Sequence, residues 1–189
     1  MKDLKMVLFL LILSSLCALV LGGTEVFYEK ASVIFNQRLY QSVLELFNQE
    51  TPIEEVDAAF SGKFSFDTHG GRDYFLEKET GVVVFKADGP GLWSRIEILL
   101  ALNPDFESLY GLKVLSQAET PGLGGRIAEP EFQDSFRGIE VVPSLRIVKF
   151  AAAANEVDAV TGASKTCEAL EKIINKAVAE ARQAYKKGL

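Results

Sequence analysis

Cysteine and histidine are scarce in this chain of 189 residues, which contains two cysteines and one histidine. Cys17 lies in an apolar run near the N-terminus and Cys167 lies far along the chain, so we expect no disulfide bond. Two distant thiols also lack the grouped ligands that zinc or an iron–sulfur cluster requires. We interpret Cys167 as a small buried residue, with a reactive thiol as the alternative. The one histidine, His69, lies in a turn sequence and is expected to be solvated, which disfavours a serine hydrolase that would need it as a base.

The chain also has no excess of positively charged residues. The chain has 20 Lys and Arg residues against 26 Asp and Glu residues, which gives a formal net charge of −6 at pH 7. No basic segment rises above this background, so we expect no nucleic-acid partner. Apolar residues make up 48% of the chain, which is enough to form a buried core. The length fits one domain plus a targeting or anchoring segment.

One long run without charge covers residues 6–23, with the sequence MVLFLLILSSLCALVLGG. Its length is at the lower end of what spans a bilayer, where about 20 apolar residues are expected. Lys2 and Lys5 precede the run and Glu25 is the first charge after it. The positive-inside rule then places residues 1–5 in the cytoplasm and the rest of the chain on the periplasmic face of the inner membrane. We predict a single-pass transmembrane helix over 6–23, with a cleaved signal peptide as the alternative.

Residues 24–50 carry apolar side chains at intervals of three and four, which is the spacing of an amphipathic helix. We predict a juxtamembrane helix over this range. The helix lacks the Lys and Arg enrichment of helices that lie on a membrane surface, so we expect it to pack on its own domain. Its apolar stripe consists of Phe27, Ala31, Ile34, Phe35, Leu39, Val43, Leu46 and Phe47.

Residues 51–189 are predicted to fold as one extracytoplasmic α+β domain, a compact antiparallel sheet with flanking helices. Short apolar runs broken by Gly and Asp between residues 60 and 85 indicate a meander of strands. Further strands are expected over residues 94–102, 109–116 and 145–150, and a short helix over residues 130–136. The final helix is expected over residues 164–187, with an apolar stripe made of Leu170, Ile173, Ile174, Ala177, Val178 and Ala181.

Small and hydroxyl-bearing residues are concentrated in the sequence DAVTGASKT, residues 158–166, directly before that final helix. Such a segment presents hydroxyl groups at a helix N-terminus, where backbone N–H groups and the helix dipole favour an anion. A plain helix start with a hydroxyl N-cap accounts for the same residues without any ligand. The residues that could surround a bound phosphate are Thr161, Gly162, Ala163, Ser164, Lys165 and Thr166.

Residues 158–166 resemble the flavinylation motif of the FMN-binding domain family, which usually reads acid, two variable residues, Ser or Thr, Gly, Ala, then Thr. In that family the final hydroxyl is esterified to the phosphate of FMN, which implies a covalent FMN on Ser164. Two more segments resemble the family: ETPGLG at residues 119–124, which lines the flavin there, and GLWS at residues 91–94. Alone, the segment at residues 119–124 is also explained by an ordinary tight turn. The resemblance implies flavin contacts from Glu119, Thr120, Leu123, Gly124, Leu92 and Trp93.

The layout of one membrane helix and an exported domain resembles two groups within that family. These are the G subunit of the Rnf ferredoxin:NAD oxidoreductase complex and the C subunit of the Na+-translocating NADH:quinone reductase. The resemblance implies an electron-carrying subunit of an ion-translocating complex, which would not be catalytic alone. Its partners would be other membrane subunits and an FAD-dependent flavin transferase. The short chain favours the Rnf subunit as first hypothesis, although residues 91–94 are closer to the quinone reductase subunit. A non-redox anchored binding module is the more distant alternative.

Overall fold

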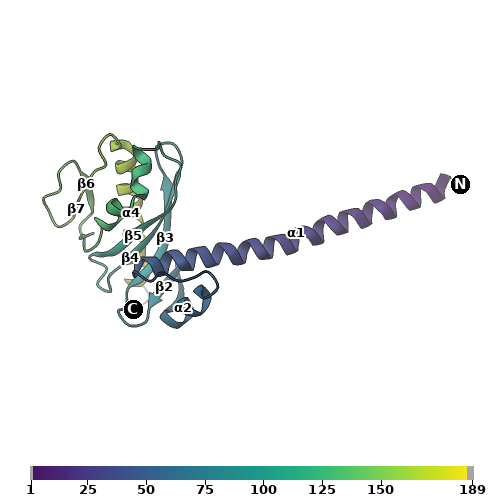
Figure 1. The fold of residues 1–189 in the computed structure, drawn as a ribbon, viewed down its shortest axis with the longest axis horizontal. Coiled ribbons are helices and arrows are strands. Elements are labelled where there is room, and N and C mark those ends of the chain that lie inside the picture. The colour runs from purple at the N-terminus through teal and green to yellow at the C-terminus, as the bar shows by residue number, and fades with distance from the viewer. Residues whose placement is uncertain (1, 187–189) are drawn as a thin grey trace. The chain divides into compact units, whose positions relative to one another are not determined.

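The computed structural model describes residues 2–186, and it gives the backbone alone for residues 2, 3, 5, 20–32, 185 and 186. The chain divides into two units, Met1–Tyr40 and Gln41–Leu189. Helix α1 (Lys2–Leu46) forms the first unit and continues into the second (Figure 1). Within the described residues, no helix has both the length and the apolar character that crossing a membrane demands.

The two segments predicted before residue 50 form one continuous helix as far as Leu46. The large apolar side chains described between residues 4 and 19 are exposed, from 44% at Leu13 to 74% at Leu19. Near the end of the helix the environment changes, because Val43 and Leu44 are fully buried within the second unit. The last turn of α1 therefore belongs to the core of the second unit, ahead of the boundary predicted at residue 51.

A five-stranded antiparallel sheet in the order β1-β2-β3-β4-β5 forms the centre of the second unit. Tyr74, Phe85, Leu100 and Leu112 lie opposite one another on successive strands, and all four are buried. Such a row of cross-strand partners fixes the register, because a slip by one residue would turn the row to the other face. The antiparallel meander predicted from the sequence is confirmed. The strands are β1 (Phe64–His69), β2 (Arg72–Glu77), β3 (Val83–Pro90), β4 (Arg95–Leu102) and β5 (Leu109–Ser116).

The C-terminal helix α4 (Ser164–Lys186) packs against the sheet and closes the core. At Gly89 on β3 the helix approaches so closely that an added Cβ would lie 2.6 Å from Cγ1 of Ile173. The glycine therefore lets the helix lie directly on the sheet. The predicted apolar stripe is confirmed, since all six of its residues are buried.

Two short strands, β6 (Arg146–Val148) and β7 (Glu156–Asp158), form a parallel pair beside α4. The Ile147 N–H donates to the Glu171 carboxylate at 2.7 Å, and the Leu145 N–H donates to the Asn175 side chain at 2.9 Å. These bonds tie β6 to the side of α4. The remaining elements are α2 (Val56–Lys63), the 3-10 helix η1 (Gly124–Ala128) and α3 (Pro130–Asp134).

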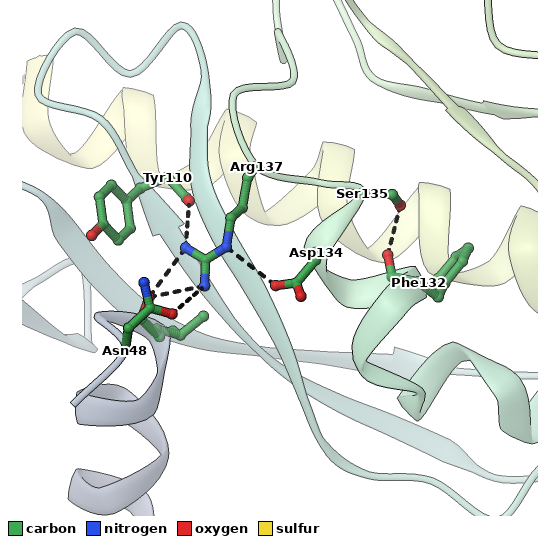
Figure 2. A network of polar contacts seen from close by, with 7 residues as sticks. Asn48, Tyr110, Phe132, Asp134, Ser135 and Arg137 are labelled. Carbon is green, nitrogen blue, oxygen red and sulfur yellow. Dashed lines mark hydrogen bonds and ion pairs between the residues drawn. The ribbon is translucent and has the colours of Figure 1, made fainter. Parts of the chain in front are cut away.

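Arg137 holds the end of α1 against the rest of the second unit (Figure 2). Both terminal nitrogens of its guanidinium group donate to the Leu46 carbonyl at 3.2 Å, and one also reaches the Asn48 side chain. Its Nε donates to the Asp134 carboxylate at 3.2 Å, and another bond reaches the Tyr110 carbonyl. The last carbonyls of a helix lack partners within the helix, so this arginine satisfies one of them.

Candidate cofactor-binding site

A turn at Gly162 directly precedes helix α4. Gly162 has φ +81°, a conformation that L side chains rarely adopt, and the Ala163 N–H donates to the Val160 carbonyl at 3.0 Å. The Cys167 N–H donates to the Ala163 carbonyl, so Ala163 is the N-cap and Ser164 is the first helical residue. The N–H groups of the first turn lack intrahelical acceptors and point out of the helix end, where they favour an anion.

A cavity of about 250 Å³ lies at this helix start. Thr161, Gly162 and Ser164 line it from the turn, and Ile147 and Lys149 line it from β6 and the residue after it. The cavity therefore combines an exposed hydroxyl and a helix N-terminus with a lysine in its lining, and this set of groups suits a phosphate. Its other lining residues are Ala159, Val160, Cys167 and Glu168.

The cation beside the cavity is Lys149, which no sequence motif singled out. Lys165 was the expected cation, but its Nζ lies 2.9 Å from the Glu168 carboxylate and its side chain is 70% exposed. Lys149 lies just after β6, within the strand predicted over 145–150, and no local pattern marked it. Its place depends on the parallel pairing of β6 with β7.

Two carboxylates shape the loop that follows Lys149. Asp158, the acid at the start of the motif, accepts a hydrogen bond from the Ala151 N–H at 2.7 Å. Glu156 accepts two more from the N–H groups of Ala152 and Ala153, and these bonds lower the pKa of its carboxyl. The motif acid thus acts through the backbone, by fixing the loop beside the cavity.

The three segments singled out in the sequence meet at Glu119. Its Oε1 accepts hydrogen bonds from the N–H groups of Trp93 at 3.0 Å and Ser94 at 3.3 Å. Its Oε2 accepts a hydrogen bond from the Thr166 hydroxyl at 2.8 Å. Burial alone would raise the pKa of Glu119, but these bonds, with one from the Leu92 N–H, hold it below its ordinary value. Glu119 is therefore an ionised carboxylate that joins the two loops to α4.

Glycines allow this close approach. A Cβ added at Gly91 would lie 2.5 Å from Oε1 of Glu119, and one added at Gly124 would lie 2.5 Å from the Thr166 hydroxyl. Real Cβ atoms do not come so close, so each position needs a residue without a side chain. The spacing of glycines in these segments thus reflects packing around one buried carboxylate.

The hydroxyl groups of the motif have different environments. Thr166 is 1% exposed and donates to Glu119, so its oxygen is not accessible to a reagent from outside. Ser164 and Thr161 are exposed and line the cavity. Among the expected site residues, Ala163, Thr166, Glu119 and Gly124 are buried, whereas Leu92, Trp93, Thr120, Leu123, Thr161, Gly162, Ser164 and Lys165 are exposed.

Residues 91–179 match the family model of the FMN-binding domain, and this range contains all three segments. This part of the chain belongs to the FMN-binding domain family. The exposed hydroxyl, the helix N-terminus and the lysine at the cavity fit the phosphate of such a cofactor. Leu92, Trp93 and Leu123 are exposed apolar side chains that do not line this cavity. The motifs alone had indicated the same family.

Curated relatives of the FMN-binding domain are C subunits of the Na+-translocating NADH-quinone reductase. The chain is 35% identical to that of Neisseria meningitidis serogroup A over 98 residues, 48% of this chain and 38% of the relative. It is 37% identical to that of Haemophilus ducreyi over 108 residues, 52% of this chain and 42% of the relative. The chain thus matches about two fifths of the length of these relatives.

Two solved structures share the fold. The C subunit of the Na+-translocating NADH-quinone reductase from Parabacteroides distasonis has a TM-score of 0.69 at 19% identity, covering 78% of this chain and 91% of that one. NqrC of Shewanella oneidensis has a TM-score of 0.66 at 20% identity, covering 75% and 90%. These likenesses confirm the α+β fold with a five-stranded antiparallel sheet. They extend beyond the FMN-binding domain match to most of the second unit.

Proposed function

We propose that this protein is an FMN-carrying electron-transfer subunit of an ion-translocating complex of the NADH-quinone reductase type, in the position of the C subunit. The support is the FMN-binding domain match together with curated and structural relatives that are C subunits. Those relatives favour this assignment over the G subunit of an Rnf complex, which the shortness of the chain had favoured. Its partners are the other membrane subunits of that complex.

The FMN is held covalently, as a phosphate ester of Ser164. The observation that carries this proposal is that Ser164 offers an exposed hydroxyl in the cavity at the start of α4, while Thr166 is buried and donates to Glu119. In the attachment step a flavin transferase uses FAD as donor. The Ser164 oxygen forms a bond to the FMN phosphorus, the pyrophosphate bond of FAD breaks, AMP leaves and the hydroxyl proton is released.

The residues of the site bind and orient the cofactor, which supplies one-electron and two-electron chemistry when bound. The N–H groups of the first turn of α4 and the ammonium group of Lys149 stabilise the phosphate. Leu92, Trp93 and Leu123 are 51%, 72% and 44% exposed, and they offer apolar surface to the ring. Lys165 contributes little net positive charge at the phosphate, since its ammonium group is paired with the Glu168 carboxylate.

The chain is anchored in the inner membrane by residues 6–23, with residues 1–5 in the cytoplasm and the FMN-binding domain on the periplasmic face. This proposal rests on the uncharged run and on the lysines that precede it. An anchor keeps the domain in a thin layer next to membrane-bound redox partners and so raises their effective concentration. A covalent ester retains the flavin outside the cytoplasm, where no pool of free flavin would replace a lost cofactor.

The attachment proposal is tested by the intact mass of the protein after co-expression with a flavin transferase. The wild-type chain is expected to exceed its sequence mass by one FMN minus one water, and its denatured band is expected to fluoresce in a gel. Ser164→Ala is expected to abolish both signals, whereas Thr161→Ala, which removes the neighbouring exposed hydroxyl, is expected to retain the adduct. An adduct that persists in Ser164→Ala would place the ester elsewhere, and a wild-type chain without any adduct would overturn covalent attachment.

A further inference from the structure

Glu119 is buried, with 4% of its area exposed, yet it does not line the cavity at the start of α4. Its carboxylate instead accepts hydrogen bonds from Trp93, Ser94 and Thr166, an arrangement that we call the Glu119 bridge. Trp93 lies in the loop after β3 and Thr166 lies in the first turn of α4. The bridge is therefore a link between the exposed aromatic residue and the helix turn that carries Ser164.

The two carboxylate oxygens of Glu119 accept hydrogen bonds from different segments. Oε1 accepts from the backbone of residues 93 and 94, and Oε2 accepts from α4. A second contact reinforces the loop side, because the Ala118 N–H donates to the Ser94 hydroxyl at 2.7 Å. Removing the Thr166 hydroxyl would free α4 from the bridge while leaving the loop side in place.

A second buried carboxylate with a threonine partner, Glu77, lies at the opposite end of β3, in the turn that connects β2 to β3, and its hydrogen bonds all go to Oε2. The buried carboxylate of Glu77 accepts hydrogen bonds from the Thr80 N–H, the Thr80 hydroxyl and the Glu79 N–H. This Glu77 bridge joins residues of one local turn, whereas the Glu119 bridge joins segments far apart in the sequence. The two bridges therefore provide a matched pair for experiment, one at the site and one away from it.

From this arrangement we infer that Glu119 is a positioning residue for flavin attachment and not a flavin contact. Through Thr166 it fixes the first turn of α4, and so the Ser164 hydroxyl, relative to the loop that carries Trp93. This inference rests on the proposed function, because it assumes that Ser164 is the attachment residue. The hydrogen bonds themselves, and not the charge alone, perform the positioning.

The first measurement is the initial rate of FMN attachment per folded full-length chain, with a flavin transferase and FAD present. Thr166→Val removes the α4 side of the bridge and is expected to slow attachment by at least about tenfold, the lower end of the range that corresponds to losing one hydrogen bond to a charged group. Thr166→Ser keeps the hydroxyl and is expected to restore most of the rate. Peptide mapping of the wild-type adduct keeps these results distinct from attachment at Thr166 itself.

The matched control is Thr80→Val, which removes the equivalent hydroxyl from the Glu77 bridge. It is expected to lower the melting temperature and to leave the attachment rate per folded chain unchanged. Glu119→Gln separates hydrogen bonding from charge: the amide oxygen can accept from the two backbone N–H groups and the amide nitrogen can donate to the Thr166 oxygen. Glu119→Gln is therefore expected to keep most of the attachment rate, whereas Glu119→Ala loses it.

A second measurement needs no flavin. Amide hydrogen exchange of the unmodified protein is expected to accelerate at residues 93 and 94 in Glu119→Ala, and only at the start of α4 in Thr166→Val. The inference is overturned if Thr166→Val attaches FMN at the wild-type rate, or if Thr80→Val slows attachment equally. A wild-type chain that takes up no FMN overturns the proposed function instead, and the exchange pattern then still reports whether the bridge exists.

Discussion

At the scale of single residues, two buried carboxylates contribute to the way stability depends on pH. For both Glu119 and Glu77, burial alone would raise the pKa, and hydrogen bonds outweigh it and hold the pKa below its ordinary value. A lowered folded-state pKa contributes stability that is present above the unfolded pKa and is lost as the pH falls through the folded pKa. The contribution of these two groups to the unfolding free energy is therefore expected to decline as the pH falls through the unfolded-state Glu pKa of about 4.3, and to keep declining until the folded-state pKa is passed.

Denaturant titrations between pH 7 and pH 3 check this expectation. Glu77→Gln is expected to be less stable than the wild type at pH 7 and to converge toward it as the pH falls. Parallel curves across the whole range would show that the Glu77 carboxylate has the same pKa in the folded and unfolded states. Glu77 suits this measurement because its turn is remote from the cavity, so that loss of stability is not mixed with loss of cofactor.

Gly162 and Gly122 allow backbone strain to be separated from a steric contact. Both have positive φ, +81° and +73°, so an alanine at either position is strained by about 1 kcal/mol or more. At Gly162 the new Cβ would also lie 2.9 Å from Cδ2 of Leu123, whereas at Gly122 nothing lies within 4 Å. Gly162→Ala is expected to lose more stability than Gly122→Ala, measured by urea denaturation, and to displace the Leu123 side chain. Equal losses would mean that Leu123 moves aside freely.

At the scale of elements, the parts that could be predicted are those in which an apolar pattern repeats over many residues. The strands of the meander have six to eight residues, and α4 repeats its apolar stripe along the helix, so both were found from the sequence. The parallel pair β6–β7 was not found as such, because each strand has three residues and their partners are ten residues apart. Lys149 was missed for the same reason, since only this pairing brings it to the cavity.

In the candidate site, too, features with a local cause could be predicted from the sequence, whereas features that depend on distant partners could not. The motif placed Ser164 at a helix start because small and hydroxyl residues at such positions have a local cause. The role of Glu119 could not be found locally, since its partners lie 26 and 47 residues away in the sequence. The signal that could have suggested this role is an acidic residue accompanied by glycines. Gly91 and Gly124 both lack side chains where Glu119 and Thr166 need room.

At the scale of the whole molecule, the compact second unit begins within α1 and not after it. The last turn of α1 supplies Val43, Leu44 and Leu46 to the core of that unit, and Leu46 also offers its carbonyl to Arg137. The match to solved structures also extends well beyond the segment recognised as the FMN-binding domain. A domain boundary drawn from helix periodicity alone would therefore cut through a core.

This placement predicts a sharp difference between two truncated chains. A chain of residues 41–189 keeps the buried end of α1 and is expected to unfold cooperatively and to accept FMN at Ser164. A chain of residues 51–189 loses three buried apolar side chains, each worth about 1.5–3 kcal/mol, and leaves the Arg137 guanidinium without the Leu46 carbonyl. Set against a typical total stability of about 5–15 kcal/mol, that loss is large. Thermal melts of the two chains provide the comparison, and a 51–189 chain as stable as the 41–189 chain would show that the end of α1 is dispensable to the fold.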